Sequence, residues 1–292
     1  PAGRPGSADR CGGPELYAQA ERLRWCYAFC RRPFGRVYRS CRAAWSRPAT
    51  LFACCTSSAV ACQNSRPPGT RLTVFLAGCP LRCLYCHNPD TWNMMNGMAI
   101  PLERAVATVN MYRHGLKIMG GGVTVSGGEP LMQDRFVVRL LTAARGMGVH
   151  TALDTNGYLG ERLSDEELEQ IDLVLLDIKT WGEAKHRHLT GKDPGPTLDF
   201  ARRLAQRGIT IWLRYVLVPG LTDGENDITQ LAEFAASLGN VERVDVLPFH
   251  QLGRYKWEKL GMDYQLNDLE PPSRELVEGV CKQFRAAGLT TY

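Results

Sequence analysis

The chain has 292 residues, of which 44% are hydrophobic, and a formal net charge of +5 at pH 7. This length accommodates one large domain or two ordinary ones with a sizeable core. No uninterrupted apolar run approaches the roughly 18–20 residues that a membrane-spanning helix needs. We therefore expect a soluble protein without a membrane partner.

Charge and cysteine divide the chain into two unlike parts. Residues 1–66 hold eleven arginines, no lysine and three acids, whereas residues 67–292 hold 24 basic and 27 acidic residues. The larger part lacks the basic surplus of nucleic-acid-binding proteins, so we expect no nucleic-acid partner. Seven of the eleven cysteines precede residue 67, and after it only Cys281 lies outside one tight motif. So few cysteines in the larger part fit a reducing compartment.

The leader, residues 1–66, is rich in arginine and poor in acids, which is typical of an organellar transit peptide. Its cysteines, glycines and prolines argue against that reading, and a mis-assigned leader is the alternative. We expect a poorly structured extension over residues 1–66 and one folded domain over residues 67–292. The predicted location is cytoplasmic, or the chloroplast or mitochondrion if the leader is a transit peptide.

From residue 71 onward, short apolar or β-branched runs alternate with stretches of helical periodicity. Strands are predicted at Leu72–Ala77, Val123–Ser126, His150–Asp154, Leu173–Ile178, Thr210–Val218 and Arg243–Leu247. Helices are predicted at Leu102–Leu116, Leu131–Met147, Asp165–Ile171, Pro196–Arg207, Asn226–Leu238 and Ser273–Ala287. Continuous apolar strands suit a parallel sheet that is covered on both faces. Six strand–helix units predict an α/β fold, a partial (β/α)6 barrel of the TIM type.

The first predicted strand is followed by the chain's densest group of metal-ligating residues. Cys79, Cys83 and Cys86 form a C-x3-C-x2-C motif, with Tyr85 just before the third cysteine. A structural zinc site or an ordinary iron–sulfur site has four protein ligands. Three thiolates on a cubane cluster leave one iron open to a small molecule. A Cys3His zinc site that includes His87 stays open as an alternative.

Polar residues follow the other predicted strands at their carboxyl ends. In chain order these are Ser126-Gly127-Gly128-Glu129-Pro130, Asp154-Thr155-Asn156-Gly157, Asp177-Ile178-Lys179, then Arg214 within the fifth strand and Pro248-Phe249-His250 after the sixth. The carboxyl ends of parallel barrel strands face one mouth, where barrel active sites form. We therefore expect one site built from these segments and the cysteine loop.

These motifs resemble the radical S-adenosylmethionine superfamily and, within it, the pyruvate formate-lyase activating enzymes. The resemblance runs from about residue 69 to the C-terminus and rests on the cysteine motif, on the strand-end motifs above, and on Trp-Leu-Arg-Tyr-Val-Leu-Val-Pro-Gly at 212–220 and Leu-Pro-Phe-His-Gln-Leu-Gly at 247–253. One departure is Arg66-Pro67-Pro68-Gly69, where the family usually has Asp-Gly-Pro-Gly.

The resemblance implies an iron–sulfur oxidoreductase. Cys79, Cys83 and Cys86 would bind one 4Fe–4S cluster and act as catalytic residues, and S-adenosylmethionine would bind the fourth iron. Its reductive cleavage would give a 5′-deoxyadenosyl radical, which abstracts hydrogen from a glycine of pyruvate formate-lyase. A flavodoxin- or ferredoxin-type protein is the expected electron donor, and the enzyme is expected to be a monomer.

The resemblance also implies roles for the strand-end residues. The predicted cofactor-binding residues are Tyr85, Gly127, Gly128, Glu129, Asp154, Asp177, Lys179, Arg214 and His250. Asp154, Thr155 and Asp177 are the predicted ligands of a monovalent cation, since hard cations take oxygen ligands.

Two other functions stay open. One is activation of a different glycyl-radical enzyme. Many activases of that kind carry an additional cysteine-rich insert, whereas residues 88–121 contain no cysteine. The other is a Cys3His zinc-binding structural module, which gives no reason for the six strand-end motifs.

Overall fold

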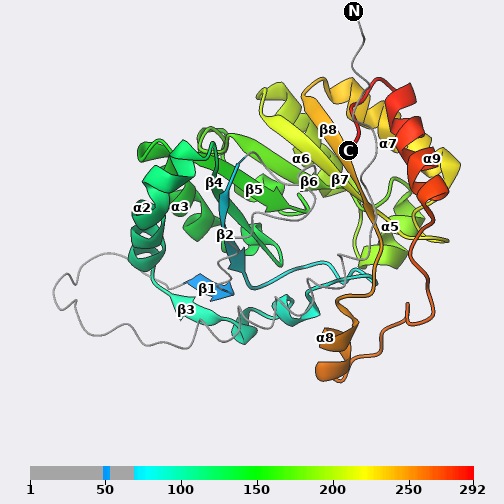
Figure 1. Ribbon diagram of the computed structural model, residues 1–292, viewed down its shortest axis with the longest axis horizontal. Coiled ribbons are helices and arrows are strands. Elements are labelled where there is room, and N and C mark those ends of the chain that lie inside the picture. The colour runs from blue at the N-terminus through cyan, green and yellow to red at the C-terminus, as the bar shows by residue number, and fades with distance from the viewer. Residues whose placement is uncertain (1–48, 53–68) are drawn as a thin grey trace, which may run out of the picture. The chain divides into compact units, whose positions relative to one another are not determined.

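The computed structural model describes residues 49–52 and 69–292. Within them the strands form one open sheet in the order β3-β1-β2-β4-β5-β6-β7-β8 (Figure 1). The strands are β1 (Ala49–Phe52), β2 (Arg71–Leu76), β3 (Met98–Ile100), β4 (Gly122–Gly127), β5 (His150–Thr155), β6 (Leu173–Asp177), β7 (Thr210–Leu217) and β8 (Val241–Pro248). From β2 to β8 all neighbouring strands are parallel, whereas β1 pairs antiparallel with β2 and β3.

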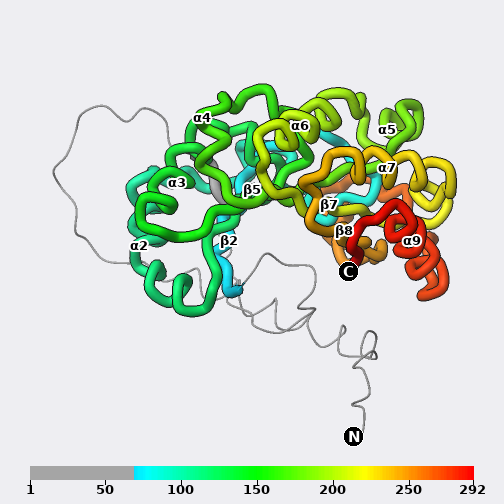
Figure 2. The backbone as a smooth tube through the Cα atoms, turned by 90° about the horizontal axis from the view of Figure 1, so that it is seen from above, coloured from blue at the N-terminus to red at the C-terminus, as the bar shows by residue number. Residues whose placement is uncertain are grey.

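Helices follow the parallel strands and cover one face of the sheet. Figure 2 shows α2, α3, α4, α6, α7 and α9 in succession around the outside of the strands. The helices are α2 (Leu102–Ile118), α3 (Asp134–Gly146), α4 (Asp165–Leu168), α5 (Glu183–Thr190), α6 (Gly195–Gln206), α7 (Glu225–Leu238), α8 (Arg254–Lys259) and α9 (Arg274–Ala286), with 3-10 turns η1 (Pro89–Thr91), η2 (Met94–Asn96), η3 (Pro130–Gln133) and η4 (Gly160–Arg162). None of the described helices is long and apolar enough to cross a membrane.

The two faces of the sheet carry different side chains because successive strand residues point to opposite sides. On β4, Val123 and Val125 join the large core that the sheet forms with the helices. On the inner face, Ala152, Leu173, Leu175 and Trp212 form a small apolar cluster of their own. The charged residues at the carboxyl ends of β5, β6 and β7 lie above this cluster, because they follow it along the same strands.

The predicted partial (β/α)6 barrel is confirmed. All six predicted strands are present, with ends within two residues of the prediction, and they are the six parallel strands of the sheet. Four of the six predicted helices match closely, but the predicted Asp165–Ile171 helix ends at Leu168, and the predicted Leu131–Met147 helix is divided into η3 and α3. The short strands β1 and β3 and the helices α5 and α8 were not predicted.

Part of the predicted leader belongs to the sheet. Ala49–Phe52 forms β1, in which Leu51 and Phe52 pair with Leu76 and Phe75 of β2. The rest of residues 1–66 lies outside the described residues, so a boundary between residues 66 and 67 stays a prediction. At the other edge, the chain returns along β8, where the Tyr292 N–H donates to the Val244 carbonyl at 3.0 Å.

Candidate active site

The cysteine loop leaves the carboxyl end of β2 and is fastened at several points to its surroundings. The Gly78 N–H donates to the Thr91 carbonyl at 2.7 Å, and the Arg82 N–H donates to the Thr190 carbonyl at the end of α5 at 2.8 Å. Within the motif, the Cys86 N–H donates to the Cys83 carbonyl at 3.0 Å. These hydrogen bonds hold the course of the loop.

The three cysteines lie in an environment that favours neutral thiols. Burial raises the pKa of Cys79 and Cys86, and it raises that of Cys83 to about 12 although the Lys179 ammonium opposes the shift. Metal ions bind the thiolate, so binding a metal centre here releases protons. Soft thiolates are the ligands of iron–sulfur clusters, and three of them in one fixed loop fit such a group.

A single zinc ion and a cubane cluster require different spacings of the three thiolates. With Zn–S bonds of about 2.3 Å, three thiolates on one zinc ion lie within about 4 Å of one another. The described residues contain no group of three His, Cys, Asp or Glu side chains placed to hold a single metal ion. His87, the fourth ligand of the zinc alternative, stacks on His250 at 4.1 Å between ring centroids, and its Nε2 lies 3.0 Å from the His250 carbonyl. A cubane spreads its thiolates over different irons and does not need one common centre.

Apolar side chains enclose the loop. Cys83 and Tyr85 belong to a buried cluster with Leu81, Leu189, Val218, Phe249, Trp257 and Tyr264. The Trp257 indole N–H on α8 donates to the Cys86 carbonyl at 2.8 Å, which ties this helix to the third cysteine. The Tyr85 hydroxyl is buried and has no hydrogen-bond partner among the described residues, and the Lys179 ammonium lies 5.8 Å from its ring centroid. This shell buries Cys83, whereas Cys79 and Cys86 stay partly exposed.

The glycines after β4 are required by the close approach of two chain segments. Gly127 has φ 125°, and a Cβ at this position would lie 2.2 Å from the Leu76 carbonyl oxygen. A Cβ on Gly128 would lie 2.4 Å from the Gly78 carbonyl oxygen. The Gly128 and Glu129 N–H groups donate to those carbonyls of Leu76 and Gly78 at 2.8 and 2.7 Å. The turn thus packs directly on the start of the cysteine loop.

Glu129 is fully buried, and its carboxylate binds protein groups. It accepts hydrogen bonds from the Leu131 N–H at 3.0 Å, the Thr155 hydroxyl at 2.7 Å and the Asn156 N–H at 2.8 Å. Burial raises its pKa to about 7, although all three hydrogen bonds favour the ionised form. The side chain therefore joins the turn after β4 to the turn after β5. The cofactor-binding role of the Gly127–Glu129 segment stays a prediction.

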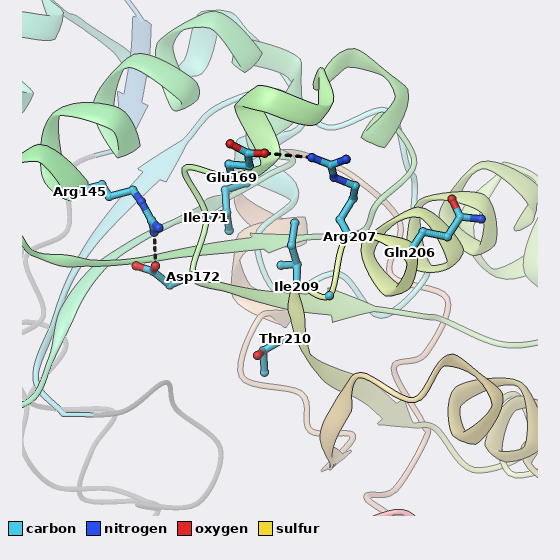
Figure 3. A pocket seen from close by; sticks show the side chains of 9 residues that line it. Arg145, Glu169, Ile171, Asp172, Gln206, Arg207, Ile209 and Thr210 are labelled. Atoms are coloured by element: carbon cyan, nitrogen blue, oxygen red, sulfur yellow. Dashed lines mark hydrogen bonds and ion pairs between the residues drawn. The ribbon is translucent and has the colours of Figure 1, made fainter.

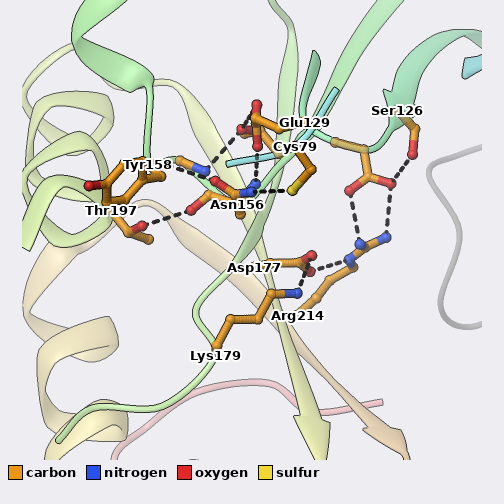
Figure 4. Close-up of polar contacts among 12 residues, drawn as sticks. Cys79, Ser126, Glu129, Asn156, Tyr158, Asp177, Lys179, Thr197 and Arg214 are labelled. Carbon is orange, nitrogen blue, oxygen red and sulfur yellow. Dashed lines mark hydrogen bonds and ion pairs between the residues drawn. The ribbon is translucent and has the colours of Figure 1, made fainter. Parts of the chain in front are cut away.

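Four charged residues from three neighbouring strands form one network at the mouth of the sheet (Figure 4). Arg214 on β7 binds Asp154 at 2.9 and 3.1 Å and Asp177 at 2.8 Å. Lys179 binds the other oxygen of Asp177 at 2.7 Å, and the Ser126 hydroxyl donates to Asp154 at 2.8 Å. The structure thus brings together the predicted residues of the second to fifth strands.

The pKa values of the two carboxyl groups in this network shift in opposite directions. Burial opposes ionisation of Asp177, but Arg214 and Lys179 outweigh it and hold its pKa below the usual range. Burial raises the pKa of Asp154 despite the Arg214 guanidinium. Thr155 takes no part in the network, because its hydroxyl points to Glu129 on the other side of the strand end.

His250 lies beside the cysteine loop, where the sequence predicts it. Burial lowers its pKa, and burial together with His250 lowers the pKa of His87 to about 4. Both imidazoles are therefore neutral at pH 7.

Two residues of this region were missed by the sequence reasoning. Asn156 places its amide against Cys79, with Nδ2 3.8 Å from Sγ. Asp227 on α7 accepts from the Thr180 hydroxyl and from the Trp181 and Gly182 N–H groups at 3.1 and 2.6 Å, which holds the segment after Lys179. Neither residue has a specific signal in the sequence. Asn156 belongs to an Asn-Gly pair, which indicates only a turn, and Asp227 is an acid in the first turn of a helix, which is common.

A hollow of about 540 Å³ lies at the opposite end of the sheet, where β6 and β7 begin (Figure 3). Its charged residues are already paired: Arg145 with Asp172, and Arg207 with Glu169 at 3.0 Å. Its size is within the range of ligand pockets. Barrel chemistry, however, is located at the carboxyl ends of the strands, and residues at the other end serve stability. We therefore place the site at the cysteine loop.

The chain is similar in sequence to known proteins. The model of the radical SAM superfamily matches residues 73–235. The pyruvate formate-lyase 1-activating enzyme of Escherichia coli (strain K12) is 41% identical over 228 residues, which cover 76% of this chain and 93% of the relative. The pyruvate formate-lyase-activating enzyme of Staphylococcus epidermidis is 45% identical over 218 residues, which cover 72% of this chain and 87% of the relative.

Solved structures share the fold. Streptococcus suis SuiB bound to precursor peptide SuiA gives a TM-score of 0.56 at 19% identity, over 76% of this chain and 48% of SuiB. A radical SAM methyltransferase from Sphaerobacter thermophilus gives 0.53 at 20% identity, over 76% of this chain and 65% of the methyltransferase. The family match and the two close relatives, together with the cysteine loop at the mouth of six parallel strands, show that the chain belongs to the radical SAM superfamily and, within it, to the family of pyruvate formate-lyase-activating enzymes.

Proposed function

We propose that this protein activates pyruvate formate-lyase by generating a radical on one of its glycines. When bound, a 4Fe–4S cluster and S-adenosylmethionine supply a one-electron reductive cleavage of a carbon–sulfur bond and a hydrogen abstraction from that glycine. Cys79, Cys83 and Cys86 would hold the cluster. The observation that carries the proposal is that the cysteine loop and the charged network both lie at the carboxyl ends of the parallel strands. The network consists of Asp154, Asp177, Lys179 and Arg214.

The chain's own residues bind and orient the reactants. Lys179 uses one of the three donors of its ammonium group on Asp177, which leaves donors for the carboxylate of S-adenosylmethionine. Arg214 is positioned between Asp154 and Asp177, and its positive charge offsets part of their negative charge. The apolar shell buries Cys83 and Tyr85, and a site with little water strengthens the electrostatic interactions within it.

The remaining cofactor contacts are part of the same proposal. Tyr85 lies within the cysteine loop, His250 stacks on His87 directly after it, and the Gly127–Gly128 backbone lies against its start. We assign these four residues to contacts with the cofactor. Their positions in and beside the loop support this assignment.

A monovalent cation beside the cofactor also belongs to the proposal. Asp154 and Asp177 supply carboxylate oxygens at neighbouring strand ends, which suits a hard cation. Arg214 already neutralises part of this charge, so we expect weak binding that strengthens when a cofactor carboxylate is present. Isothermal titration of S-adenosylmethionine in sodium, potassium and tetramethylammonium buffers tests this, and equal affinities in all three would contradict it.

The choice of pyruvate formate-lyase over another glycyl-radical enzyme rests on the relatives and on the segment before β4. Residues 88–121 form η1, η2, β3 and α2 and contain no cysteine for a second cluster. A flavodoxin- or ferredoxin-type electron donor, a monomeric enzyme and a cytoplasmic location complete the proposal. The chloroplast or mitochondrion alternative rests on the leader alone, of which the structure describes only β1.

One experiment tests the proposed function. We mix the reconstituted full chain anaerobically with S-adenosylmethionine, a reductant and pyruvate formate-lyase. The amount of glycyl radical is then quantified by electron paramagnetic resonance (EPR). We expect the radical with the wild type and none with Cys83→Ala. Cleavage of S-adenosylmethionine without a radical on pyruvate formate-lyase would support activation of another glycyl-radical enzyme instead.

A further inference from the structure

Asn156 lies in the turn after β5 and contacts the first cysteine of the motif. Its side chain is buried, and its Nδ2 donates to the Cys79 Sγ at 3.8 Å (Figure 4). Neither the cysteine motif nor any predicted role involves this amide. Because Cys79 is a proposed cluster ligand, this hydrogen bond bears on the properties of the cluster.

The direction of the amide is determined by its other contacts. The Asn156 Oδ1 accepts from the Tyr158 N–H at 3.0 Å, so the NH2 end of the same amide must face the sulfur. The backbone of Asn156 is held as well, because its N–H donates to Glu129 at 2.8 Å and its carbonyl accepts from the Thr197 hydroxyl at 2.8 Å. These hydrogen bonds hold the donor in place beside the sulfur.

A fixed donor beside a cluster thiolate changes the energy of reduction. One-electron reduction adds negative charge to the cluster and its sulfurs, and an N–H dipole pointing at a sulfur stabilises the more negative state more strongly. Hydrogen bonds to the sulfurs and burial are among the factors that set cluster potentials. Asn156 is buried and Cys79 is partly buried, and electrostatic effects are larger where solvent is limited.

We propose that Asn156 raises the reduction potential of the cluster through its hydrogen bond to Cys79 and so makes the one-electron reduction easier. The proposal rests on the cluster of the proposed function, but it concerns the potential and not the protein that is activated. Asn156 acts through Cys79 and is a positioning residue for the electron-transfer step.

The test compares midpoint potentials in the reconstituted full chain. Asn156→Leu keeps the approximate shape and removes the donor. At a fixed applied potential, we expect its ratio of reduced to oxidised cluster to fall by up to about tenfold, a shift of about 59 mV toward negative potential for a one-electron couple. Thr197→Val is the matched control, because it removes a hydrogen bond to the same turn and leaves the amide on the sulfur. We expect its midpoint to equal that of the wild type.

A second measurement needs no variant. The wild-type chain is prepared with asparagine that carries 15N only at its side-chain amide, because the Asn88 backbone N–H also donates to Cys86. It is then reduced and examined by pulsed EPR for a 15N hyperfine coupling to the cluster. A coupling that is absent from unlabelled protein supports the proposal. No coupling, an unchanged midpoint in Asn156→Leu, or an equal shift in Thr197→Val would each overturn it. Failure of the wild type to form any cluster would instead overturn the proposed function.

Discussion

Arg214 on β7 binds both carboxylate oxygens of Asp154 on β5, at 2.9 and 3.1 Å, across the intervening strand β6. On the way it also contacts Asp177 of β6 at 2.8 Å. Two carboxylates on adjacent strands would repel each other in a site with little water. The guanidinium between them allows both to remain at the mouth of the sheet, where the cofactor is proposed to bind.

Replacing Arg214 by methionine should destabilise the protein by about 3 kcal/mol, because removing one partner leaves largely buried carboxylates unpaired. The unfolding free energy from urea denaturation measures this. Arg202→Met is the matched control, since Arg202 and Asp199 form an exposed pair with 52% and 75% side-chain exposure. We expect it to change stability by less than about 1 kcal/mol. Equal losses in the two variants would refute the central role of Arg214.

Gly128→Ala should displace the cysteine loop. The added Cβ would lie 2.4 Å from the Gly78 carbonyl oxygen, one residue before Cys79. We expect loss of at least half of the bound iron after reconstitution, together with reduced stability. Gly279→Ala in α9 is the control, because its Cβ meets no atom within 4 Å and alanine favours a helix by up to about 1 kcal/mol. Normal iron content in Gly128→Ala would show that the close approach does not matter.

Glu129 should make stability depend on pH. Its pKa is raised to about 7 in the fold, so between the unfolded pKa of about 4.3 and pH 7 the folded state binds more protons than the unfolded state. The unfolding free energy therefore falls as pH rises through this window. Glu129→Gln has no titrating carboxyl group at this position. The unfolding free energy of the wild type minus that of the variant should therefore decrease by on the order of 2 kcal/mol from pH 4.5 to 7.5. A constant difference between the two proteins across these pH values would contradict the raised pKa.

Cys83→Ala should abolish cluster binding, whereas Cys281→Ala should retain it. Cys83 lies in the loop at the mouth of the sheet, and Cys281 is buried in α9 among core residues. Iron and sulfide content after anaerobic reconstitution provide the measurement. If both variants lost iron equally, the ligand assignment would be wrong.

Much of this arrangement was predictable because the strand-end motifs and the strands have strong local signals. The apolar runs of β6 and β7 are continuous, and their carboxyl ends carry Asp177 and Arg214, so the meeting of these two residues follows from a parallel sheet. The elements that were missed have weak signals. β3 is three residues long with two exposed positions, and α5 has only three buried residues, so neither shows a clear period.

The contacts that sequence reasoning missed depend on packing between turns. Glu129 follows two glycines, a context that suggested backbone contacts to a ligand, yet its carboxylate is buried against Thr155 and Asn156. The sequence around Asn156 indicates a turn, but it does not reveal that the Asn156 side chain faces Cys79. Such roles follow from the distance between two loops, which composition and periodicity do not encode.

The central claim is that three cysteines hold a cluster with one iron open to S-adenosylmethionine. The most direct test is EPR of the anaerobically reconstituted and reduced full chain, recorded with and without S-adenosylmethionine. We predict the signal of a reduced 4Fe–4S cluster that changes shape when S-adenosylmethionine is added. A colourless protein that binds one zinc ion, or a cluster signal that the cofactor leaves unchanged, would contradict the account.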